Sequence, residues 1–354
     1  MPSTFTIADR PVGPGHRPFV IAEVAQAHDG SLGAAHAFID CAAECGADAI
    51  KFQTHIAEAE STRDEPFRVR FSYEDATRYD YWTRMEFSAE QWAGLARHAR
   101  EAGLVFLSSP FSLEAIALLE ALDVPAWKVA SGEVGHGALV DAMLATGKPL
   151  LLSSGMSTYA DLDGTIARIA RAGERSALAV FQCTTKYPTP LEEVGLDMLD
   201  AFSRRFGVPV GLSDHSADTL PSIAAMARGA SLIEVHLAFH RSMFGPDTKA
   251  SLVPEQLREV CRARDAIHTM LTHPLDKDGL AKSLAGSAAL FTRSLALRAP
   301  QPMGTVIEAD MLTLKKPGTG IPETERDAYI GRRLARAVPH DRLLRPDDFA
   351  PGGA

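Results

Sequence analysis

Short apolar runs alternate with longer stretches of helical periodicity along most of the chain. Each run ends in polar or small residues and precedes a stretch with apolar residues at helical spacing, such as 89–102 or 113–122. Several of these stretches end in glycine, which favours a helix stop. The pattern predicts eight strands: Phe19–Ala25, Ala49–Thr54, Val105–Phe111, Ala126–Ser131, Pro149–Gly155, Ala177–Thr184, Val208–His215 and Leu232–Phe239.

Eight strand-then-helix units over about 260 residues match a (β/α)8 TIM barrel in number and size. An open doubly wound sheet also alternates strands and helices, but it favours a glycine-rich first turn. The turn after the first predicted strand, residues 26–30, reads QAHDG and lacks that fingerprint. We therefore predict an α/β fold with a TIM barrel.

The pattern changes after about residue 282. Short strands are predicted at 291–298, 305–307 and 312–315, with a helix at 327–336 and its basic side chains Arg332, Arg333 and Arg336 on a solvated face. These elements are too short for another strand–helix unit of the barrel. We predict a barrel domain at 1–276, a linker at 277–290 and a small β-rich domain at 291–354.

Composition narrows the class of protein. The 354 residues are 46% hydrophobic and carry a formal charge of −9, which argues against a nucleic-acid partner. No apolar run approaches the roughly 18 residues of a membrane span, and the first residues lack an apolar signal core. Four cysteines are too few for a disulfide framework. We expect a cytoplasmic protein with no membrane partner.

Polar residues gather at the predicted carboxyl ends of the strands, where barrels place their sites. Lys51 and Lys128 lie inside apolar strands, where a charge is costly unless it is matched. Serine and threonine hydroxyls follow several neighbouring strands, and lysine with such donors suits a phosphorylated, carboxylated ligand. The alternative is that each lysine pairs with Glu23 or Glu234 in a buried network.

His215 and His236 end adjacent predicted strands, with Asp214 and Glu234 nearby. Two imidazoles with oxygen ligands suit a divalent ion such as Mn²⁺ with open positions. Two hydrogen-bonded histidines in a polar barrel mouth are the alternative. Cys41 and Cys45 lack a second ligand pair, which favours packing over zinc.

Several segments resemble the sialic acid synthase family of phosphoenolpyruvate-condensing enzymes. They run in order over almost the whole chain: AEVAQAHDGS (22–31), GADAIKFQTH (46–55), FLSSPFS (106–112), WKVASGE (127–133), LLSSGMS (151–157), CTTKYPTP (183–190), GLSDHS (211–216), GPDTKASL (245–252) and KKPGTGIP (315–322). The resemblance implies a transferase that forms a C–C bond, a C-terminal antifreeze-like (SAF) domain and a domain-swapped homodimer.

The resemblance also implies a role for each matching residue. The phosphoenolpyruvate cradle comprises Lys51, Ser109, Lys128, Ser131, Ser154 and Ser213. His215 and His236 are the expected ligands of Mn²⁺, Mg²⁺ or Co²⁺. The catalytic set is Glu23, Gln53, Lys51 and Glu133, with either Glu23 or Glu133 handling the attacking water. The aldose acceptor is expected to contact Gln53, Tyr187, Asp247 and Lys316.

The implied reaction joins phosphoenolpyruvate to an open-chain N-acylated amino sugar, most simply N-acetylmannosamine. The products are a nine-carbon 2-keto-3-deoxy acid and phosphate. Departures from the family pattern at Ala27, Thr185, Val235 and Lys316, and the unmatched segment 58–84, affect the acceptor half. They leave open a synthase for another acceptor, such as a legionaminic- or pseudaminic-type precursor or an unusual aldose. A catalytically silent sugar- or phosphate-binding protein is a further alternative, but it would need a broken cradle or histidine pair.

Overall fold

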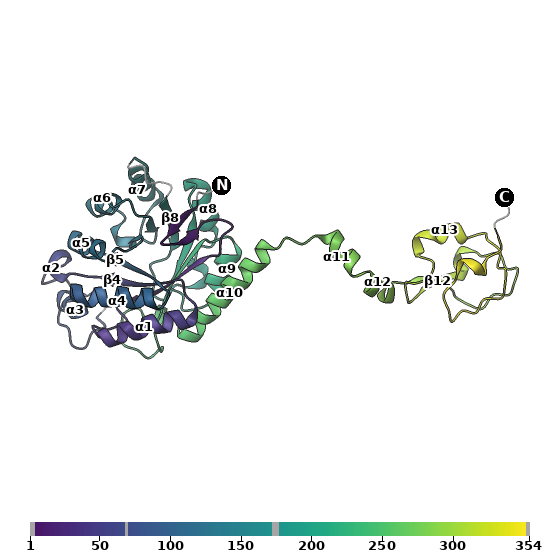
Figure 1. The fold of residues 1–354 in the computed structure, drawn as a ribbon, viewed down its shortest axis with the longest axis horizontal. Helices are drawn as coiled ribbons and strands as arrows, with labels where there is room; N and C mark the ends of the chain where they lie inside the picture. Colours follow the sequence, from purple (N-terminus) through teal and green to yellow (C-terminus); the bar gives the residue numbers. More distant parts are fainter. Residues whose placement is uncertain (1–3, 68–69, 172–176, 352–354) are drawn as a thin grey trace. The chain divides into compact units, whose positions relative to one another are not determined.

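Eight parallel strands form the central sheet of the chain and confirm the predicted barrel. A computed structural model describes residues 4–67, 70–171 and 177–351. The barrel strands are β3 (Phe19–Ala25), β4 (Ala49–Thr54), β5 (Val105–Pro110), β6 (Trp127–Val129), β7 (Leu150–Ser153), β8 (Leu178–Cys183), β9 (Val210–Asp214) and β10 (Leu232–His236). They pair in the order β5-β4-β3-β10-β9-β8-β7-β6, and β5 lies beside β6 without a hydrogen-bonded ladder (Figure 1).

Helices follow the strands and surround the sheet (Figure 1). They are α1 (Leu32–Cys45), α2 (Ala57–Glu60), α3 (Arg78–Met85), α4 (Ala89–Glu101), α5 (Leu113–Ala121), α6 (Gly137–Leu144), α7 (Tyr159–Arg171), α8 (Asp197–Phe206), α9 (Leu220–Ala227) and α10 (Pro254–Thr272). Local sequence sets their ends: Ser31 caps the start of α1, and Gly46 ends it in the left-handed region at φ +83°. Ser88 and Gln91 form a capping box that starts α4.

Strand alternation divides the barrel into an outer and an inner core. Outward side chains such as Ile50, Leu150 and Leu152 pack under the helices. Inward side chains near the amino ends of the strands, including Ile21 and Phe181, fill the barrel with apolar volume. The next inward positions toward the carboxyl ends are polar. Every second residue of a strand faces inward. The inward residues are apolar near the amino ends and polar near the carboxyl ends, so the polar residues lie at the mouth of the barrel.

An N-terminal hairpin that the sequence pattern did not predict packs against the inner core. Strands β1 (Phe5–Ile7) and β2 (Arg10–Val12) pair antiparallel, and Ile7 and Val12 are fully buried among the inward barrel residues. Each strand has only three residues, which is too short for a periodicity to show. The hairpin therefore covers apolar side chains at the end of the barrel opposite the polar mouth.

A buried carboxylate, Asp48, ties the hairpin to the barrel. It accepts hydrogen bonds from Arg10 (2.8 Å), Arg17 (2.5 Å), Arg264 of α10 (2.6 Å) and the Val20 backbone N–H (2.9 Å). Three sequence-distant segments thus share one acceptor. Because Arg264 is itself buried, the carboxylate balances a charge that water cannot solvate.

Asp48→Ala is expected to destabilise the barrel by about 3–5 kcal/mol, because it strands a buried guanidinium. Urea unfolding followed by far-UV circular dichroism measures the loss. Asp265→Ala is the matched control, since Asp265 pairs with two of the same arginines but is 55% exposed. The control is expected to cost about 1 kcal/mol or less. Equal losses in the two variants would contradict the role given to Asp48.

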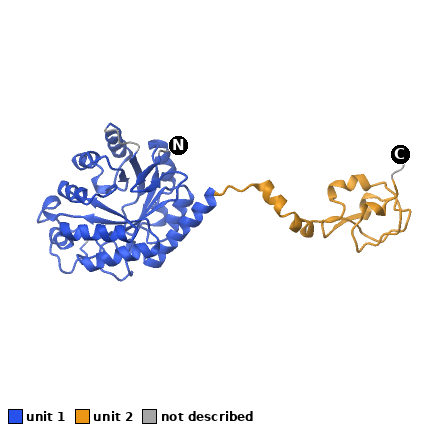
Figure 2. Ribbon diagram, viewed as in Figure 1, with its two compact units in different colours: residues 1–272 blue, residues 273–354 orange. Residues whose placement is uncertain are grey.

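The chain divides into two compact units, residues 1–272 and 273–354 (Figure 2). Unit 2 begins with α11 (Lys277–Ser283) and α12 (Ala285–Phe291), which occupy the segment predicted as a linker. It continues with the antiparallel pair β11 (Ser294–Leu297) and β12 (Leu312–Lys315), followed by α13 (Arg326–Tyr329). Its own core includes Leu295, Leu312 and Phe349.

Two details of unit 2 differ from the sequence-based expectation. The predicted helix at 327–336 was wrong in extent, because α13 ends at Tyr329 and Leu334 forms a bridge to Phe349. The basic residues 332, 333 and 336 therefore lie on extended chain rather than on a helix face. The predicted strand at 305–307 is reduced to an isolated bridge between Val306 and Arg333. In the part of the chain that the structure describes, no helix is long and apolar enough to cross a membrane.

Candidate active site

Two buried lysines and two buried carboxylates form the centre of the barrel mouth. The Lys51 Nζ atom lies 2.5 Å from Glu23 Oε2 and 3.8 Å from Glu234 Oε2. The Lys128 Nζ atom lies 3.5 Å from Glu234 Oε1. All four side chains are at most 6% exposed. The ion pairs that the sequence offered as the alternative to a ligand site are therefore present.

Hydroxyl groups surround both lysines. Lys51 donates to Ser109 Oγ at 3.2 Å, and Lys128 donates to Ser153 Oγ. Ser213 donates to Glu234 Oε1 at 3.1 Å. The lysines and serines come from five different strands, so the site depends on the closed sheet rather than on one loop. Cationic and hydroxyl donors that converge in a buried mouth suit an anionic ligand.

Burial and mutual interaction shift the pKa values of all four ionisable groups in this cluster. Burial raises the pKa of Glu23 to about 8, although Lys51 opposes the shift. Burial also favours a higher pKa for Glu234, but Lys128 and Lys51 outweigh it and lower this pKa. Burial lowers the pKa of Lys128, whereas the carboxylates outweigh burial at Lys51 and raise its pKa. Two lysines thus lie beside two carboxyl groups, and one of these, Glu23, holds its proton more tightly than an exposed carboxyl group does.

Glu23 also has unsatisfied hydrogen-bonding capacity. Neither of its carboxylate oxygens forms a well-directed hydrogen bond within the described ranges, although Lys51 lies close. Glu234 Oε2 is buried without a hydrogen bond in the same way. Buried polar atoms without partners are costly, and they commonly mark a place where a ligand or water binds. These atoms point to an occupant at the centre of the mouth.

Ser131 and Gly155 form the next part of the mouth. The Gly155 N–H donates to Ser131 Oγ at 3.1 Å, and Ser131 donates to Cys183 Sγ at 3.6 Å. A Cβ on Gly155 would lie 2.2 Å from Thr185 Oγ1, 2.7 Å from Ser131 Oγ and 2.9 Å from Cys183 Sγ. Only glycine fits this approach. Ser154, the predicted cradle residue beside it, is buried at the end of β7.

Gly155→Ala is expected to weaken phosphoenolpyruvate binding about 10-fold or more, because the new methyl group displaces the Ser131 hydroxyl. Isothermal titration calorimetry with phosphoenolpyruvate measures the affinity. Gly135→Ala is the matched control, since a Cβ there meets open space. Unchanged affinity in Gly155→Ala would show that Ser131 takes no part in the cradle.

The two predicted metal ligands lie together. The rings of His215 and His236 are 5.1 Å apart between centroids. His215 Nε2 lies 3.2 Å from the Tyr187 hydroxyl, and His215 Nδ1 lies 3.0 Å from the Thr184 carbonyl oxygen. His236 Nδ1 lies 4.0 Å from Asp247 Oδ2. Two imidazoles near hydroxyl and carboxylate oxygens therefore meet at one edge of the mouth.

The donor set fits a divalent ion with open coordination positions. Burial and the neighbouring positive charges keep the pKa of His236 well below its ordinary value, so its ring is neutral and has a lone pair to offer. Among the described residues, no group of three or more His, Cys, Asp and Glu side chains is arranged to enclose a metal. An ion held by two histidines would keep positions free for water or substrate.

The remaining predicted site residues fall in three places. Gln53 lies on β4 two residues after Lys51 and therefore faces the mouth. Glu133 instead pairs with His136 Nδ1 at 3.1 Å, away from the lysine cluster. Lys316 belongs to unit 2, where its Nζ lies 5.5 Å from the centre of the Phe291 ring.

The predicted site residues omit two side chains of the mouth: Ser153, which the sequence placed at a polar strand end without a role, and Cys183. Ser153 contacts Lys128, and Cys183 lies between Ser131 and His215, with its Sγ 4.0 Å from His215 Nδ1. Side-chain alternation could have predicted that both residues face the mouth. Ser153 lies two residues after the inward Leu151, and Cys183 lies two residues after the inward Phe181.

A further buried histidine, His28, follows β3. Its Nδ1 accepts the Gly30 N–H at 3.1 Å, which leaves Nε2 protonated and without a partner among the described residues. Burial lowers its pKa to about 3, with His55 and Arg84 adding to the effect. The unfolded chain therefore binds a proton here that the folded chain rejects between about pH 3 and pH 6.5.

Stability is expected to fall as the pH falls through this window, by about 2 kcal/mol between pH 7 and pH 5 from His28 alone. Urea unfolding of the wild type and of His28→Gln at both pH values measures the free energy of unfolding. The difference in pH dependence between the two proteins gives the contribution of His28, since the variant lacks the titrating ring. An equal pH effect in the two proteins would contradict the neutral state of His28.

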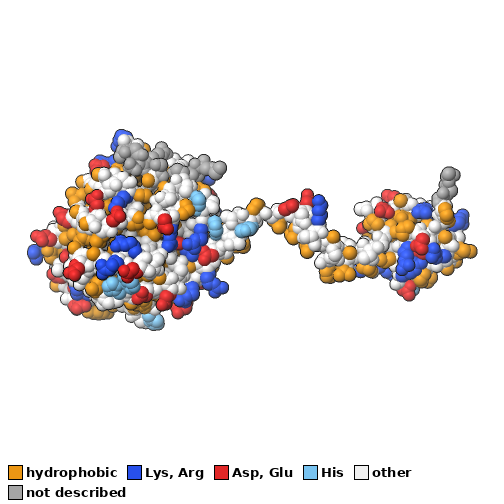
Figure 3. Space-filling model, in the orientation of Figure 1, with side chains coloured by type: hydrophobic (Ala, Val, Ile, Leu, Met, Phe, Trp, Pro, Cys, Tyr) orange, Lys and Arg blue, Asp and Glu red, His pale blue; other side chains and the backbone are white. Residues whose placement is uncertain are grey.

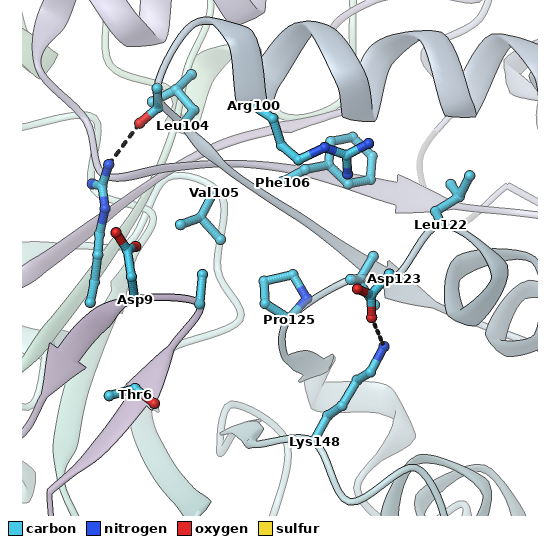
Figure 4. A pocket seen from close by; sticks show the side chains of 14 residues that line it. Thr6, Asp9, Arg100, Leu104, Val105, Phe106, Leu122, Asp123, Pro125 and Lys148 are labelled. Carbon is cyan, nitrogen blue, oxygen red and sulfur yellow. Dashed lines mark hydrogen bonds and ion pairs between the residues drawn. The ribbon is translucent and has the colours of Figure 1, made fainter.

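A cavity of about 910 Å³ lies at the other end of the barrel (Figure 4). The hairpin and the segments that precede β5, β6 and β7 line it. Two of its basic side chains are already engaged, Lys148 with Asp123 at 3.0 Å and Arg10 with Asp48. Because it lies away from the carboxyl ends of the strands, it is separate from the candidate active site.

An eight-stranded α/β barrel with buried lysines, hydroxyls and paired histidines at its mouth defines an enzyme that acts on an anionic small molecule. The model of the NeuB family matches residues 38–275, and the model of the SAF domain matches residues 292–350. The chain belongs to the NeuB family of synthases, which are transferases. The family resemblance inferred from the sequence motifs is thereby confirmed.

Individual relatives agree with this assignment. The human N-acetylneuraminate-9-phosphate synthase is 32% identical, over 94% of this chain and 93% of its own length. The N,N'-diacetyllegionaminic acid synthase of Campylobacter jejuni is 29% identical, over 92% of this chain and 98% of its own length. The crystal structure of a sialic acid synthetase from Leptospira borgpetersenii covers 81% of this chain and 98% of its own chain, with a TM-score of 0.70 and 24% identity. That last likeness shows the fold.

Proposed function

We propose that this chain condenses phosphoenolpyruvate with an open-chain N-acylated amino sugar, most simply N-acetylmannosamine, to give a nine-carbon 2-keto-3-deoxy acid and phosphate. The observation that carries the proposal is the pair of buried lysines, Lys51 and Lys128, set among serine hydroxyls beside two histidines. Phosphoenolpyruvate carries both a phosphate and a carboxylate, and each lysine would meet one anionic group.

In the proposed reaction, C3 of phosphoenolpyruvate forms a bond to the aldehyde carbon of the acceptor. The cation that develops at C2 takes up water, and phosphate leaves by cleavage of its C–O bond to C2. Lys51, Lys128 and the serines hold the phosphoenolpyruvate anion and exclude water from it. His215 and His236 would hold Mn²⁺, Mg²⁺ or Co²⁺, which supplies a Lewis acid for the acceptor aldehyde when bound.

Glu23 is the carboxyl group best placed to manage the proton of the attacking water. Its side chain lies inside the mouth against Lys51, whereas Glu133 pairs with His136 instead. A pKa of about 8 allows Glu23 to accept and return a proton near neutral pH. Glu133 remains the second candidate for this role.

The acceptor itself is tested by product identity. The named relatives make different acids, so a legionaminic- or pseudaminic-type precursor or another aldose is the alternative acceptor. The purified protein is incubated with phosphoenolpyruvate, Mn²⁺ and each of N-acetylmannosamine, its 6-phosphate and diacetamido-trideoxyhexoses. Mass spectrometry is expected to show a product from N-acetylmannosamine. Product from another aldose alone would establish the alternative, and no product from any would contradict the synthase activity.

A homodimer is part of the proposal. In unit 2, the apolar side chains of Leu284, Leu290 and Phe291 on and beside α12 are uncovered within their own unit (Figure 3). Such side chains favour a partner surface. The family resemblance places Lys316 at the acceptor site of the partner subunit. Light scattering is expected to give twice the 38.0 kDa of the chain, and a mass of 38.0 kDa would contradict the dimer.

A further inference from the structure

The His55 ring is fixed between two aromatic side chains beside the acceptor half of the site. It follows directly after β4, and it stacks on Trp82 with ring centroids 3.8 Å apart and on Phe111 at 4.2 Å. The planes are inclined by only 11° and 13°. The side chain is 6% exposed. A ring held on both faces keeps its two nitrogens in fixed directions.

Both nitrogens of this ring face hydrogen-bond acceptors. His55 Nδ1 lies 2.5 Å from Glu60 Oε1, and His55 Nε2 lies 3.3 Å from Gln53 Oε1. Gln26 Nε2 lies 3.5 Å from the same Gln53 oxygen. Both contacts are consistent with this atom being the carbonyl oxygen of the Gln53 amide. A carboxylate and a carbonyl only accept, so both bonds form together when each ring nitrogen carries a proton.

Several ionisable groups surround the ring. Glu60 of α2 supplies the adjacent carboxylate. His28, which follows β3, stays neutral because burial lowers its pKa, and Arg84 of α3 adds to that effect. Arg78 lies over the Trp82 ring, 5.0 Å from its centre. The carboxylate of Glu60 is thus the direct hydrogen-bond partner of the ring.

We propose that His55 and Glu60 are positioning residues that hold the amide of Gln53 with its carbonyl toward the imidazole and its NH2 group toward the acceptor sugar. The inference rests on the proposed function, in which Gln53 contacts the acceptor. Gln53 Nε2 forms no hydrogen bond within residues 4–67, 70–171 and 177–351, and its side chain lies on the inward face of β4. The enzyme would thereby select aldoses that present an oxygen acceptor at this point.

This arrangement belongs to the part of the chain that departs from the family pattern. Glu60 and Trp82 both lie in segment 58–84, which has no clear match to the family motifs. Local packing holds that segment in place, since Tyr81, Trp82 and Met85 form a small core with Ala57. Residues outside the quoted family motifs thus set the orientation of a residue inside one of them, KFQT.

Two variants test the proposal, and kinetics are measured with the aldose that wild type uses best. His55→Phe keeps a flat ring between Trp82 and Phe111 but removes both N–H donors. Glu60→Gln keeps the shape but removes the charge. We expect kcat/KM for the aldose to fall about 10-fold to 100-fold in His55→Phe, with KM for phosphoenolpyruvate changed less than about twofold. Glu60→Gln is expected to shift the same parameter in the same direction.

The control is His36→Phe, because His36 lies on α1 and contacts His98 outside the site. The second readout is substrate preference. It is the ratio of kcat/KM for the best aldose to kcat/KM for an analogue of that aldose that lacks one oxygen substituent. That preference is expected to fall in both test variants and to stay at the wild-type value in the control. A loss of stability alone would lower activity equally for all aldoses and for phosphoenolpyruvate.

The outcomes separate the inference from the function on which it rests. If wild type makes product and both variants keep the wild-type preference among aldoses, the positioning role is wrong and the synthase activity stands. If wild type makes no product with any aldose, the proposed function fails, and the positioning role fails with it. A His55→Phe protein that does not fold leaves Glu60→Gln to decide, since that substitution preserves size and hydrogen-bonding shape.

Discussion

Lys128→Met is expected to lower kcat/KM for phosphoenolpyruvate about 1,000-fold or more. Lys128 is a buried cation in contact with Ser153 and Glu234, and an anion in this mouth would lose a charge-assisted bond that water cannot replace. Steady-state phosphate release over a range of phosphoenolpyruvate concentrations measures the effect. Lys51→Met is expected to behave similarly, because Lys51 lies on the other side of Glu234.

A loss of folding could imitate this result, because removing one member of a buried ion pair is destabilising. The double variant Lys128→Met with Glu234→Gln removes one charge of each sign and is expected to recover most of the stability. Under the proposed function it stays inactive. Recovery of activity together with stability would show that the lysine serves only to balance Glu234, which is the structural alternative raised by the sequence.

His236→Ala is expected to reduce turnover about 1,000-fold or more while phosphoenolpyruvate still binds within a few-fold of the wild-type affinity. The imidazole lies beside His215 and Asp247, and neither Lys51 nor Lys128 donates a hydrogen bond to it among the described residues. Loss of one of two nitrogen ligands would remove the divalent ion and its Lewis acidity. His215→Ala is expected to give the same result.

Turnover is measured in metal-stripped buffer with graded additions of Mn²⁺, and binding is measured by calorimetry. His240→Ala is the matched control, because His240 is exposed and its Nδ1 accepts only the Ser242 N–H. Full activity of either site variant in metal-stripped buffer would refute a metal role for the pair. Loss of phosphoenolpyruvate binding together with turnover would assign the histidines to the cradle instead.

Much of the barrel could be predicted from the sequence because each of its strands is an apolar run with a polar end. The eight predicted strands all exist, and half of the fourteen predicted site residues lie on inward positions of these strands. The hairpin β1–β2 could not be predicted, since its stability comes from burying Ile7 and Val12 against a barrel floor that forms only in the fold. Unit 2 was predicted less well for the same reason, because isolated bridges define much of it.

The sequence indicated candidate residues for the site but not the contacts between them. The sequence places Lys51 and Glu23 on strands, but only the closed sheet shows that they form an ion pair at 2.5 Å. Glu133 was predicted as a catalytic residue from the motif WKVASGE, but its side chain pairs with His136. The sandwich around His55 joins it to Trp82 and Phe111, which lie 27 and 56 residues away in sequence, and it carries no periodic signal. Contacts of this kind depend on loop packing, which local patterns do not encode.

The most direct test of the central claim is phosphate release from phosphoenolpyruvate by the wild-type protein with Mn²⁺, with and without N-acetylmannosamine or the aldose identified by product mass. The account predicts release that requires both the aldose and the metal, stops on addition of EDTA, and is lost in Lys128→Met. Release of phosphate without any aldose, or no release with every aldose while the protein remains folded, would contradict it.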